Sequence, residues 1–481
     1  MFSSLAGLQS SLSRVQCYRT MASGSNSRPT AKARLAPPES AQRPRQSTQV
    51  LSSVVLARHG ARFPSSGVLK RLPRCEAISQ WNGALILSSI FSDSPHQQTS
   101  ADQQDSLTTI GSVQGCAFGR FLRSGVLNGS AQAQKDCRLA GWRSSSSGRV
   151  LKSGTAVTSQ FDCDQQPIID SSSDDRFQLW GQRLDFKQWV DEHVKEGQEM
   201  QLLAAKHADL LREVWSQATD GVVQVDVSDS RSCSSAEGAG GVVWSALHAA
   251  WHCTYLHELL SCETHHASNQ HMMLDGRLFG GCGESWRQHW HPPLQAPLCA
   301  LIQRLSPKHQ AFIQRCACYV WEQRFLANKQ SGAVGMPLLK QAVADLQTSK
   351  GADQNTWLYS GHDYSLLVVL AALRQHEYPP HALSFGAFLR IQLVSVDGLE
   401  SIRVSLCCDP FPLAACGFAA HIGPIKEQCL VADLPLEAIE YMLATASSVA
   451  WPLAAGAAAA AAAAGGTAEG LLAGDGAADD L

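Results

Sequence analysis

Residues 54–64 constrain the fold more than any other part of the chain, because an apolar run ends there in a cluster of charged side chains. Residues 54–57 have the pattern of a buried strand, and Arg58-His59-Gly60-Ala61-Arg62 follow at once. In open α/β sheets, ligands bind just beyond the C-terminal ends of the strands. The sequence therefore predicts an α/β sheet with a ligand site at which His59 lies between Arg58 and Arg62.

The residue types in this segment favour phosphate chemistry. Guanidinium groups hold phosphate oxygens through paired, charge-assisted hydrogen bonds. An imidazole beside a bound phosphate can attack phosphorus and carry the phosphoryl group. Gly60 would allow a close backbone approach and unusual dihedral angles at the turn. A nucleic-acid-binding patch is the alternative, but a net charge of −3 provides no basic field over the chain as a whole.

Three later segments have patterns that would complete a site of this kind. Residues 107–122 begin as a helix capped by Thr108 or Thr109. Residues 168–176 have the pattern of a strand that ends in small polar residues and Arg176. Residues 357–373 predict a strand, a turn that carries His362-Asp363, and a buried helix. Each pattern alone also has a purely structural interpretation, such as a surface ion pair at Arg176.

Taken in order, the four segments resemble the signature of the histidine acid phosphatases, which form branch two of the histidine phosphatase superfamily. This branch includes acid phosphatases, phytases and inositol polyphosphate phosphatases. The resemblance covers about residues 54–431 and is patchy between residues 178 and 330. It implies an α/β fold with an open sheet sandwiched by helices, similar to phosphoglycerate mutase, and an inserted smaller α-helical domain.

The resemblance also implies a role for each matched residue. His59 would be the nucleophile that forms a phosphohistidine, and Asp363 would be the acid that protonates the leaving oxygen. The phosphate ligands would be Arg58, Arg62, Arg176 and His362. Phosphoryl transfer depends mainly on positioning and charge stabilisation. Because the arginines supply the positive charge, neither a metal ion nor another cofactor is expected.

The predicted activity is hydrolysis of a small phosphomonoester, and its exact substrate stays open. His362-Asp363 favours acid phosphatases and phytases, since inositol polyphosphate phosphatases typically have His-Ala-Glu at this point. Phytate, another inositol polyphosphate or lysophosphatidate are alternative substrates. Additional phosphates could bind to a basic group that could equally be a solvated turn, namely Lys70, Arg71 and Arg74.

Two other functions are disfavoured, and one departure from the family pattern is notable. A non-catalytic relative that only binds phosphorylated ligands would be expected to lack a key residue, whereas His59 and Asp363 are present. Mutases of branch one lack the continuation after Arg62 that this chain has. Asp170 stands where many acid phosphatases have an arginine, which affects the local match around Arg176.

Composition predicts four regions. Residues 1–49 are rich in Ser and Arg and form a disordered or targeting segment, typical of a transit peptide for a mitochondrion or plastid or of a tail on a cytoplasmic protein, without a clear secretory signal. Residues 50–177 and 350–450 would form the catalytic domain, and residues 178–349 the inserted helical domain. Residues 451–481 are an Ala/Gly-rich tail. Residues 144–148 and 226–241 are predicted loops, and no apolar stretch reaches transmembrane length.

Histidines and cysteines raise two further questions. His248 and His252 are spaced to share one face of a helix, where they could bind zinc, but structural or surface histidines are favoured. The 16 cysteines show no zinc-binding pattern. Cys408 and Cys416 flank a predicted turn and would form a disulfide if the protein were exported. Oligomeric state cannot be inferred from these patterns.

Overall fold

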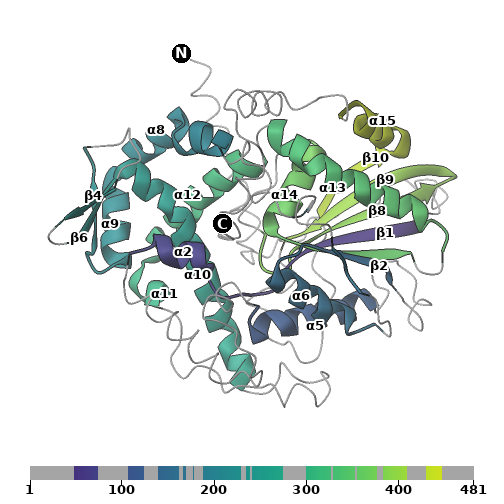
Figure 1. The fold of residues 1–481 in the computed structure, drawn as a ribbon, viewed down its shortest axis with the longest axis horizontal. Helices are drawn as coiled ribbons and strands as arrows, with labels where there is room; N and C mark the ends of the chain where they lie inside the picture. The colour runs from purple at the N-terminus through teal and green to yellow at the C-terminus, as the bar shows by residue number, and fades with distance from the viewer. Residues whose placement is uncertain are drawn as a thin grey trace, which may run out of the picture. The chain divides into compact units, whose positions relative to one another are not determined.

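The computed structural model describes residues 48–73, 107–123, 139–161, 166–169, 177, 188–228, 235–238, 241–274, 300–326, 329–352, 355–375, 383–408 and 429–446 (Figure 1). These residues all belong to one compact unit, Ser47–Leu481. The predicted targeting segment lies outside the described residues except for residues 48 and 49, which begin the first strand. Arg74, Asp170, Arg176, Cys416 and the Ala/Gly-rich tail also lie outside them.

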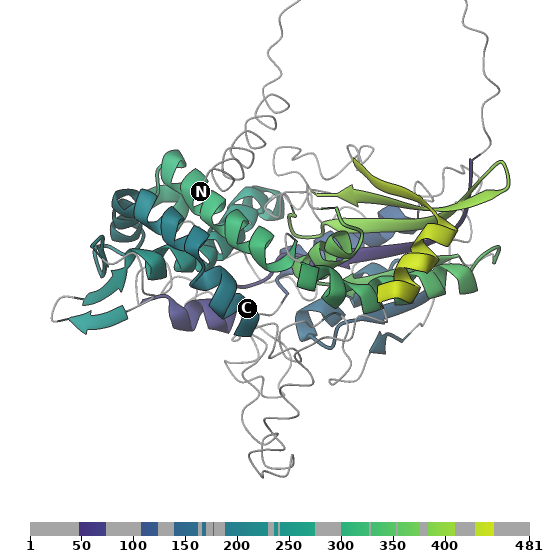
Figure 2. The ribbon, with the colours of Figure 1, turned by 90° about the horizontal axis from the view of Figure 1, so that it is seen from above.

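Within the described residues, the main element is a seven-stranded mixed sheet in the order β10-β9-β8-β1-β7-β2-β3. Strands β1, β7, β2 and β3 are parallel, whereas β8, β9 and β10 are antiparallel to their neighbours. Figure 2 shows β1 (purple) running among the other strands of the sheet. The strands are β1 (Thr48–Arg58), β2 (Leu139–Ser144), β3 (Ile168–Ile169), β7 (Thr356–Gly361), β8 (Phe388–Val396), β9 (Leu399–Cys407) and β10 (Cys429–Pro435).

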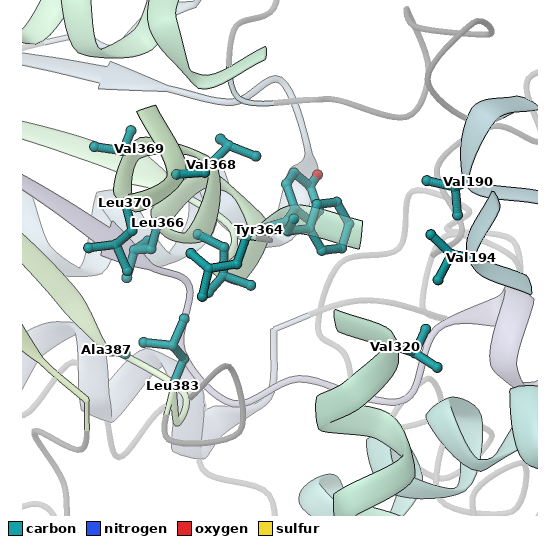
Figure 3. Close-up of a cluster of buried hydrophobic side chains, with 14 of the residues drawn as sticks. Val190, Val194, Val320, Tyr364, Leu366, Val368, Val369, Leu370, Leu383 and Ala387 are labelled. Atoms are coloured by element: carbon teal, nitrogen blue, oxygen red, sulfur yellow. The ribbon is translucent and has the colours of Figure 1, made fainter. Parts of the chain in front are cut away.

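Both faces of β1 are buried, because its alternating side chains pack into two separate clusters. Val54 and Leu56 belong to the cluster that includes α14 (Asp363–Ala372) and α13 (Lys329–Thr348). Figure 3 shows the side chains of α14 in that cluster. Val55 and Ala57 pack on the other face with side chains of α5 (Thr109–Arg123) and α6 (Gly148–Thr158). The predicted α/β sheet sandwiched by helices is therefore confirmed (Figure 1).

A block of mostly helical structure lies between β3 and β7 in the chain. It contains η3 (Asp191–Lys195), α8 (Gln198–Lys206), α9 (Ala208–Ala218), α10 (Ala246–Leu274), α11 (Ala300–Arg304) and α12 (Pro307–Phe325). It also contains a small sheet, β4 (Val223–Asp226), β6 (Gly241–Ser245) and β5 (Ser235–Gly238), in the order β4-β6-β5. Residues 235–238 were predicted to be part of a disordered loop because they are polar. They form a strand because backbone pairing with β6 depends little on their side chains.

The contacts of α13 place it with the sheet. This helix packs on α14 and also touches β1 and β8. The predicted boundary of the inserted domain at residue 349 would instead assign α13 to the helical block. Judged by the packing of α13 on the sheet, the helical block ends with α12. The division of the chain into domains stays a prediction. The remaining described helices are the short α2 (Ser66–Arg71) and α15 (Leu436–Ala446). None of the described helices combines the length and apolar character that a membrane span requires.

Candidate active site

The parallel pairing of β1 with β7 brings two distant segments of the chain together. Arg58 is the register partner of Gly361, so His59 and His362 follow at the same edge of the sheet. The backbone N–H of His59 donates to the carbonyl of Gly361 over 3.0 Å. The centroids of the two imidazole rings lie 5.7 Å apart. The predicted strand end and the predicted His362-Asp363 turn thus form one site.

Two helices hold the turn that follows His59. The backbone N–H of Gly60 donates to Ser153 Oγ of α6 over 3.1 Å. The backbone N–H of Ala61 donates to Gln114 Oε1 of α5 over 2.8 Å. Thr108 donates to the carbonyl of Ala61 through both its backbone N–H and its hydroxyl. The predicted helix at residues 107–122 therefore fixes the turn.

Gly60 is required at this turn by a close approach of two backbones. A Cβ atom at Gly60 would collide with the backbone of Gly111 in α5. The φ angle of Gly60 lies outside the left-handed region, so the expected unusual dihedral angle is not present. Thr108 caps α5 as predicted, because its hydroxyl accepts a hydrogen bond from the Gly111 N–H over 3.3 Å.

His59 is held in the form that a nucleophile requires. Its Nδ1 lies 2.8 Å from the carbonyl oxygen of Gly60. Because a carbonyl only accepts, Nδ1 carries the hydrogen and Nε2 keeps its lone pair. The side chain is 3% exposed. Burial, followed by the positive charges of Arg149, Arg58 and Arg62, lowers the pKa of His59 well below its ordinary value. The neutral form of the imidazole is therefore favoured.

Arg58 links the end of β1 to the start of α14. Its Nη2 forms an ion pair with Asp363 Oδ2 at 2.8 Å, and its Nη1 donates to the Leu383 carbonyl over 2.5 Å. The guanidinium lies 4.4 Å from the centroid of Phe385. Asp363 is the first residue of α14, where its Oδ1 accepts the backbone N–H of Tyr364 over 2.8 Å. Arg58 is therefore held rigidly beside Asp363.

Arg62 is positioned by a residue that the sequence patterns did not indicate. Its Nη2 forms an ion pair with Glu258 Oε1 of α10 at 2.8 Å. The same carboxylate oxygen accepts the backbone N–H of Ser65 over 3.1 Å. Burial alone would raise the pKa of Glu258, but Arg62 and the Ser65 N–H bring it below its ordinary value. Glu258 is thus an anion that orients Arg62. No motif around it signals this role, since it is one polar residue in a long helix.

Arg149, which was not among the predicted ligands, is the third arginine at this site among the described residues. Its Nη2 lies 3.4 Å from His362 Nδ1, and it lines the same cavity as His59. Arg176 lies outside the described residues. The predicted loop at residues 144–148 is the connection between β2 and α6: residues 145–147 belong to neither element, and Ser147 is the N-cap of α6. A usable signal was present, because residues 139–149 also have the pattern of a strand followed by serines and an arginine.

His362 caps α14 and contacts the loop after β2. Its backbone N–H donates to Ser365 Oγ, and its Nε2 lies 3.3 Å from Ser145 Oγ. Burial, followed by Arg149, Arg62 and Arg58, lowers the pKa of His362 well below its ordinary value. The neutral form of His362 is therefore favoured in the substrate-free protein.

A cavity of about 470 Å³ opens over these side chains. At the sheet edge its lining consists of Arg58, His59, Arg62, His362 and Asp363 together with Arg149, which we refer to as the floor, and α10 and α12 form much of the remaining wall. Lys70 and Arg71, the described members of the predicted basic group, do not line it. Lys70 is exposed on α2, and Arg71 donates to the Tyr255 hydroxyl over 3.0 Å.

His248 and His252 stack on each other in α10, with ring centroids 4.0 Å apart. Both also contact the indole of Trp244, and His252 Nδ1 lies 2.9 Å from the carbonyl of His248. Burial lowers the pKa of His248 to about 4 and that of His252 to about 3. Within the described ranges, no group of three or more His, Cys, Asp or Glu side chains is arranged to hold a metal ion.

Comparison with known proteins identifies the fold. No family model and no curated protein matches the chain. Among solved structures, the apo form of the Hafnia alvei phytase matches with 14% identity and a TM-score of 0.50, over 84% of this chain and 98% of that one. The Citrobacter braakii phytase matches with 13% identity and a TM-score of 0.49, over 83% and 98%. The Bifidobacterium longum multiple inositol polyphosphate phosphatase, in complex with inositol hexasulfate, matches with 11% identity and a TM-score of 0.45, over 77% and 89%. This chain therefore has the fold of the Hafnia alvei phytase, in agreement with the fold expected from its four sequence segments.

Proposed function

We propose that this protein is a phosphomonoester hydrolase of the histidine acid phosphatase type and that His59 carries the phosphoryl group. The observation that carries the proposal is the buried His59, whose Nε2 keeps its lone pair in a cavity whose described lining contains four arginines, three of which, Arg58, Arg62 and Arg149, lie on its floor. A neutral imidazole beside guanidinium groups suits attack on a phosphate ester. The phytase fold supports the same reaction class.

In this proposal, the phosphate group binds to Arg58, Arg62, Arg149 and His362. Arg62 is already oriented by the carboxylate of Glu258, and Nη1 of Arg58 is held by the Leu383 carbonyl. Preorganised donors of this kind need little rearrangement as charge develops on the phosphoryl oxygens. Arg149 joins the predicted ligands because it lies beside His362, whereas the role suggested for Arg176 stays a prediction.

The reaction would proceed in two displacements. The Nε2 lone pair of His59 forms a bond to phosphorus while the bond from phosphorus to the ester oxygen breaks. Asp363, in its protonated form, gives its proton to the leaving oxygen. A water molecule then attacks the phosphohistidine, Asp363 takes the proton of that water, and the bond between phosphorus and nitrogen breaks. In the substrate-free protein Asp363 pairs with Arg58, so a bound phosphate would replace that carboxylate as the partner of Arg58.

The test combines a substitution with chemical trapping. The His59→Ala variant should hydrolyse 4-nitrophenyl phosphate at no measurable rate, whereas the control variant His193→Ala, altered at an exposed histidine of η3, should match the wild type. Wild-type protein quenched in alkali during turnover of a ³²P-labelled ester should retain label that acid releases, as a phosphohistidine does. Wild-type turnover by the His59→Ala variant would refute the nucleophile assignment.

A second substitution tests the proton donor. Asp363→Asn should slow esters of alcohols much more than 4-nitrophenyl phosphate, because only a poor leaving group requires protonation as it departs. The measurement is the ratio of kcat/KM for glycerol 3-phosphate to that for 4-nitrophenyl phosphate. An unchanged ratio would remove Asp363 from the mechanism.

A further inference from the structure

Aromatic rings form a continuous row from the outer wall of the cavity to the phosphate site. Trp321 of α12 lies 5.1 Å from Phe325, and Phe325 lies 5.8 Å from Tyr364, measured between ring centroids. Tyr364 stacks on His362 at 4.6 Å. All four residues line the cavity; Phe325, Tyr364 and His362 are buried, and Trp321 is partly exposed. We refer to Trp321, Phe325, Tyr364 and His362 as the aromatic row.

Other parts of the described wall have a similar character. Leu260 of α10, together with Leu383 and Phe385 before β8, adds apolar surface. Uncharged side chains that can form hydrogen bonds also line the cavity, namely Thr254, Ser261, Thr264, Gln310 and Gln314. A cavity of about 470 Å³ in which apolar side chains alternate with hydrogen-bonding groups has the size of a small-molecule site.

Charge is concentrated at the floor of the cavity. The described lining there contains Arg58, Arg62 and Arg149 against the carboxylates of Glu258 and Asp363. Away from the floor, the described lining contains one arginine, Arg324, and no lysine. The guanidinium of Arg324 lies 4.5 Å from the centroid of Trp251. One phosphate dianion is thus matched by the floor. Among the described lining residues, the five additional phosphates of phytate would meet Arg324 as the further arginine, and unpaired charges in a desolvated site are costly.

We propose that the preferred substrate carries one phosphate on an uncharged body whose aromatic or apolar face lies against Trp321, the partly exposed end of the aromatic row. This inference rests on the proposed phosphatase function and names its substrate class. It also distinguishes the protein from the phytase whose fold it shares. Trp321 is the specificity determinant, because it is the member of the row farthest along the wall from His362 and is partly exposed.

The test compares esters whose leaving alcohols have similar acidity, so that chemistry does not mask binding. The wild type should show a kcat/KM for 2-phenylethyl phosphate at least about tenfold above those for glycerol 3-phosphate and phytate. Trp321→Ala should lower the value for 2-phenylethyl phosphate about tenfold, mainly through KM, and leave glycerol 3-phosphate within about twofold. Tyr319→Ala is the control on the same helix, since Tyr319 bonds to Glu199 and does not line the cavity.

A gain-of-function variant tests the charge argument. Gln314 is exposed on the cavity wall, so Gln314→Arg should raise kcat/KM for phytate about tenfold relative to the neutral control Gln314→Met. Phytate turnover by the wild type at or above the rate for 2-phenylethyl phosphate would overturn the inference. An equal loss on all substrates in Trp321→Ala would do the same.

A binding measurement separates this inference from the proposed function. Calorimetry with 2-phenylethylphosphonate and with inositol hexasulfate requires no turnover. One outcome is that no ester is hydrolysed, that the phosphonate binds more tightly than inositol hexasulfate, and that Trp321→Ala weakens phosphonate binding about tenfold. In that case the proposed hydrolase function fails while the ligand class stands. Tighter binding of inositol hexasulfate would overturn the ligand class, whether or not the protein is a hydrolase.

Discussion

Replacement of Arg149 by alanine should remove most of the activity of this protein without unfolding it. Arg149 lies 3.4 Å from His362 and lowers the pKa of His59 more than any other charged side chain does. If it binds the transferring phosphoryl group, the alanine variant loses two charge-assisted hydrogen bonds. Arg176, which the sequence patterns suggested instead, provides the comparison.

The expected loss follows from the strength of such hydrogen bonds. Each one contributes about 1.5–3 kcal/mol. Because about 1.4 kcal/mol corresponds to a factor of ten, kcat/KM should fall by about 10²- to 10⁴-fold in Arg149→Ala. Arg149→Lys should lie between the alanine variant and the wild type, since lysine keeps the charge but not the planar fork of donors. Folding should be preserved, because the substitution removes repulsion among positive charges that surround His59.

The assay is hydrolysis of 4-nitrophenyl phosphate as a function of pH, with thermal unfolding of each variant as the control for folding. Without Arg149, the pKa of His59 should rise, because burial and Arg149 are the two largest causes of its depression. The acidic limb of the kcat/KM profile should therefore move to higher pH, which a general loss of packing would not produce. If kcat/KM of Arg149→Ala stays within threefold of the wild type while kcat/KM of Arg176→Ala falls 10²-fold, Arg149 is not the third phosphate-binding arginine.

Three further predictions follow from the contacts around the site. Glu258→Ala leaves the buried Arg62 without its 2.8 Å ion-pair partner, so urea unfolding should show a loss of about 3 kcal/mol, with a smaller loss for Glu258→Gln. Gly60→Ala forces the turn away from the backbone of α5, so kcat/KM should fall about 10²-fold, and an unchanged value would mean that the turn adapts. The unfolded state protonates His59 and His362 near pH 6.5, whereas the folded state does not. The free energy of unfolding should therefore decrease as pH falls below about 6.5, by up to about 1.4 kcal/mol per pH unit for each histidine. Inorganic phosphate should reduce this slope, because a bound anion favours the protonated imidazoles; thermal unfolding at pH 7.5, 6 and 5 measures both effects.

Local patterns in the sequence were sufficient for the framework. The apolar run before Arg58 predicts β1, the polar cap at Thr108 predicts α5, and the turn at His362-Asp363 predicts the junction of β7 and α14. These elements are encoded by short-range features, namely burial periodicity, capping and turn residues. Strand β5 was missed because it has no such short-range signal. Its stability comes from pairing with β6 rather than from its own composition.

The sequence by itself determined the position of His59 between two arginines, since these residues are adjacent in the chain. Only the tertiary structure decided which other residues join them. Parallel register between β1, β7 and β2 brings His362 and Arg149 to the same sheet edge, and the packing of α10 brings Glu258 to Arg62. Such contacts join residues hundreds of positions apart. These contacts depend on the order of the strands and on helix packing. The types of the two residues in a contact do not specify either.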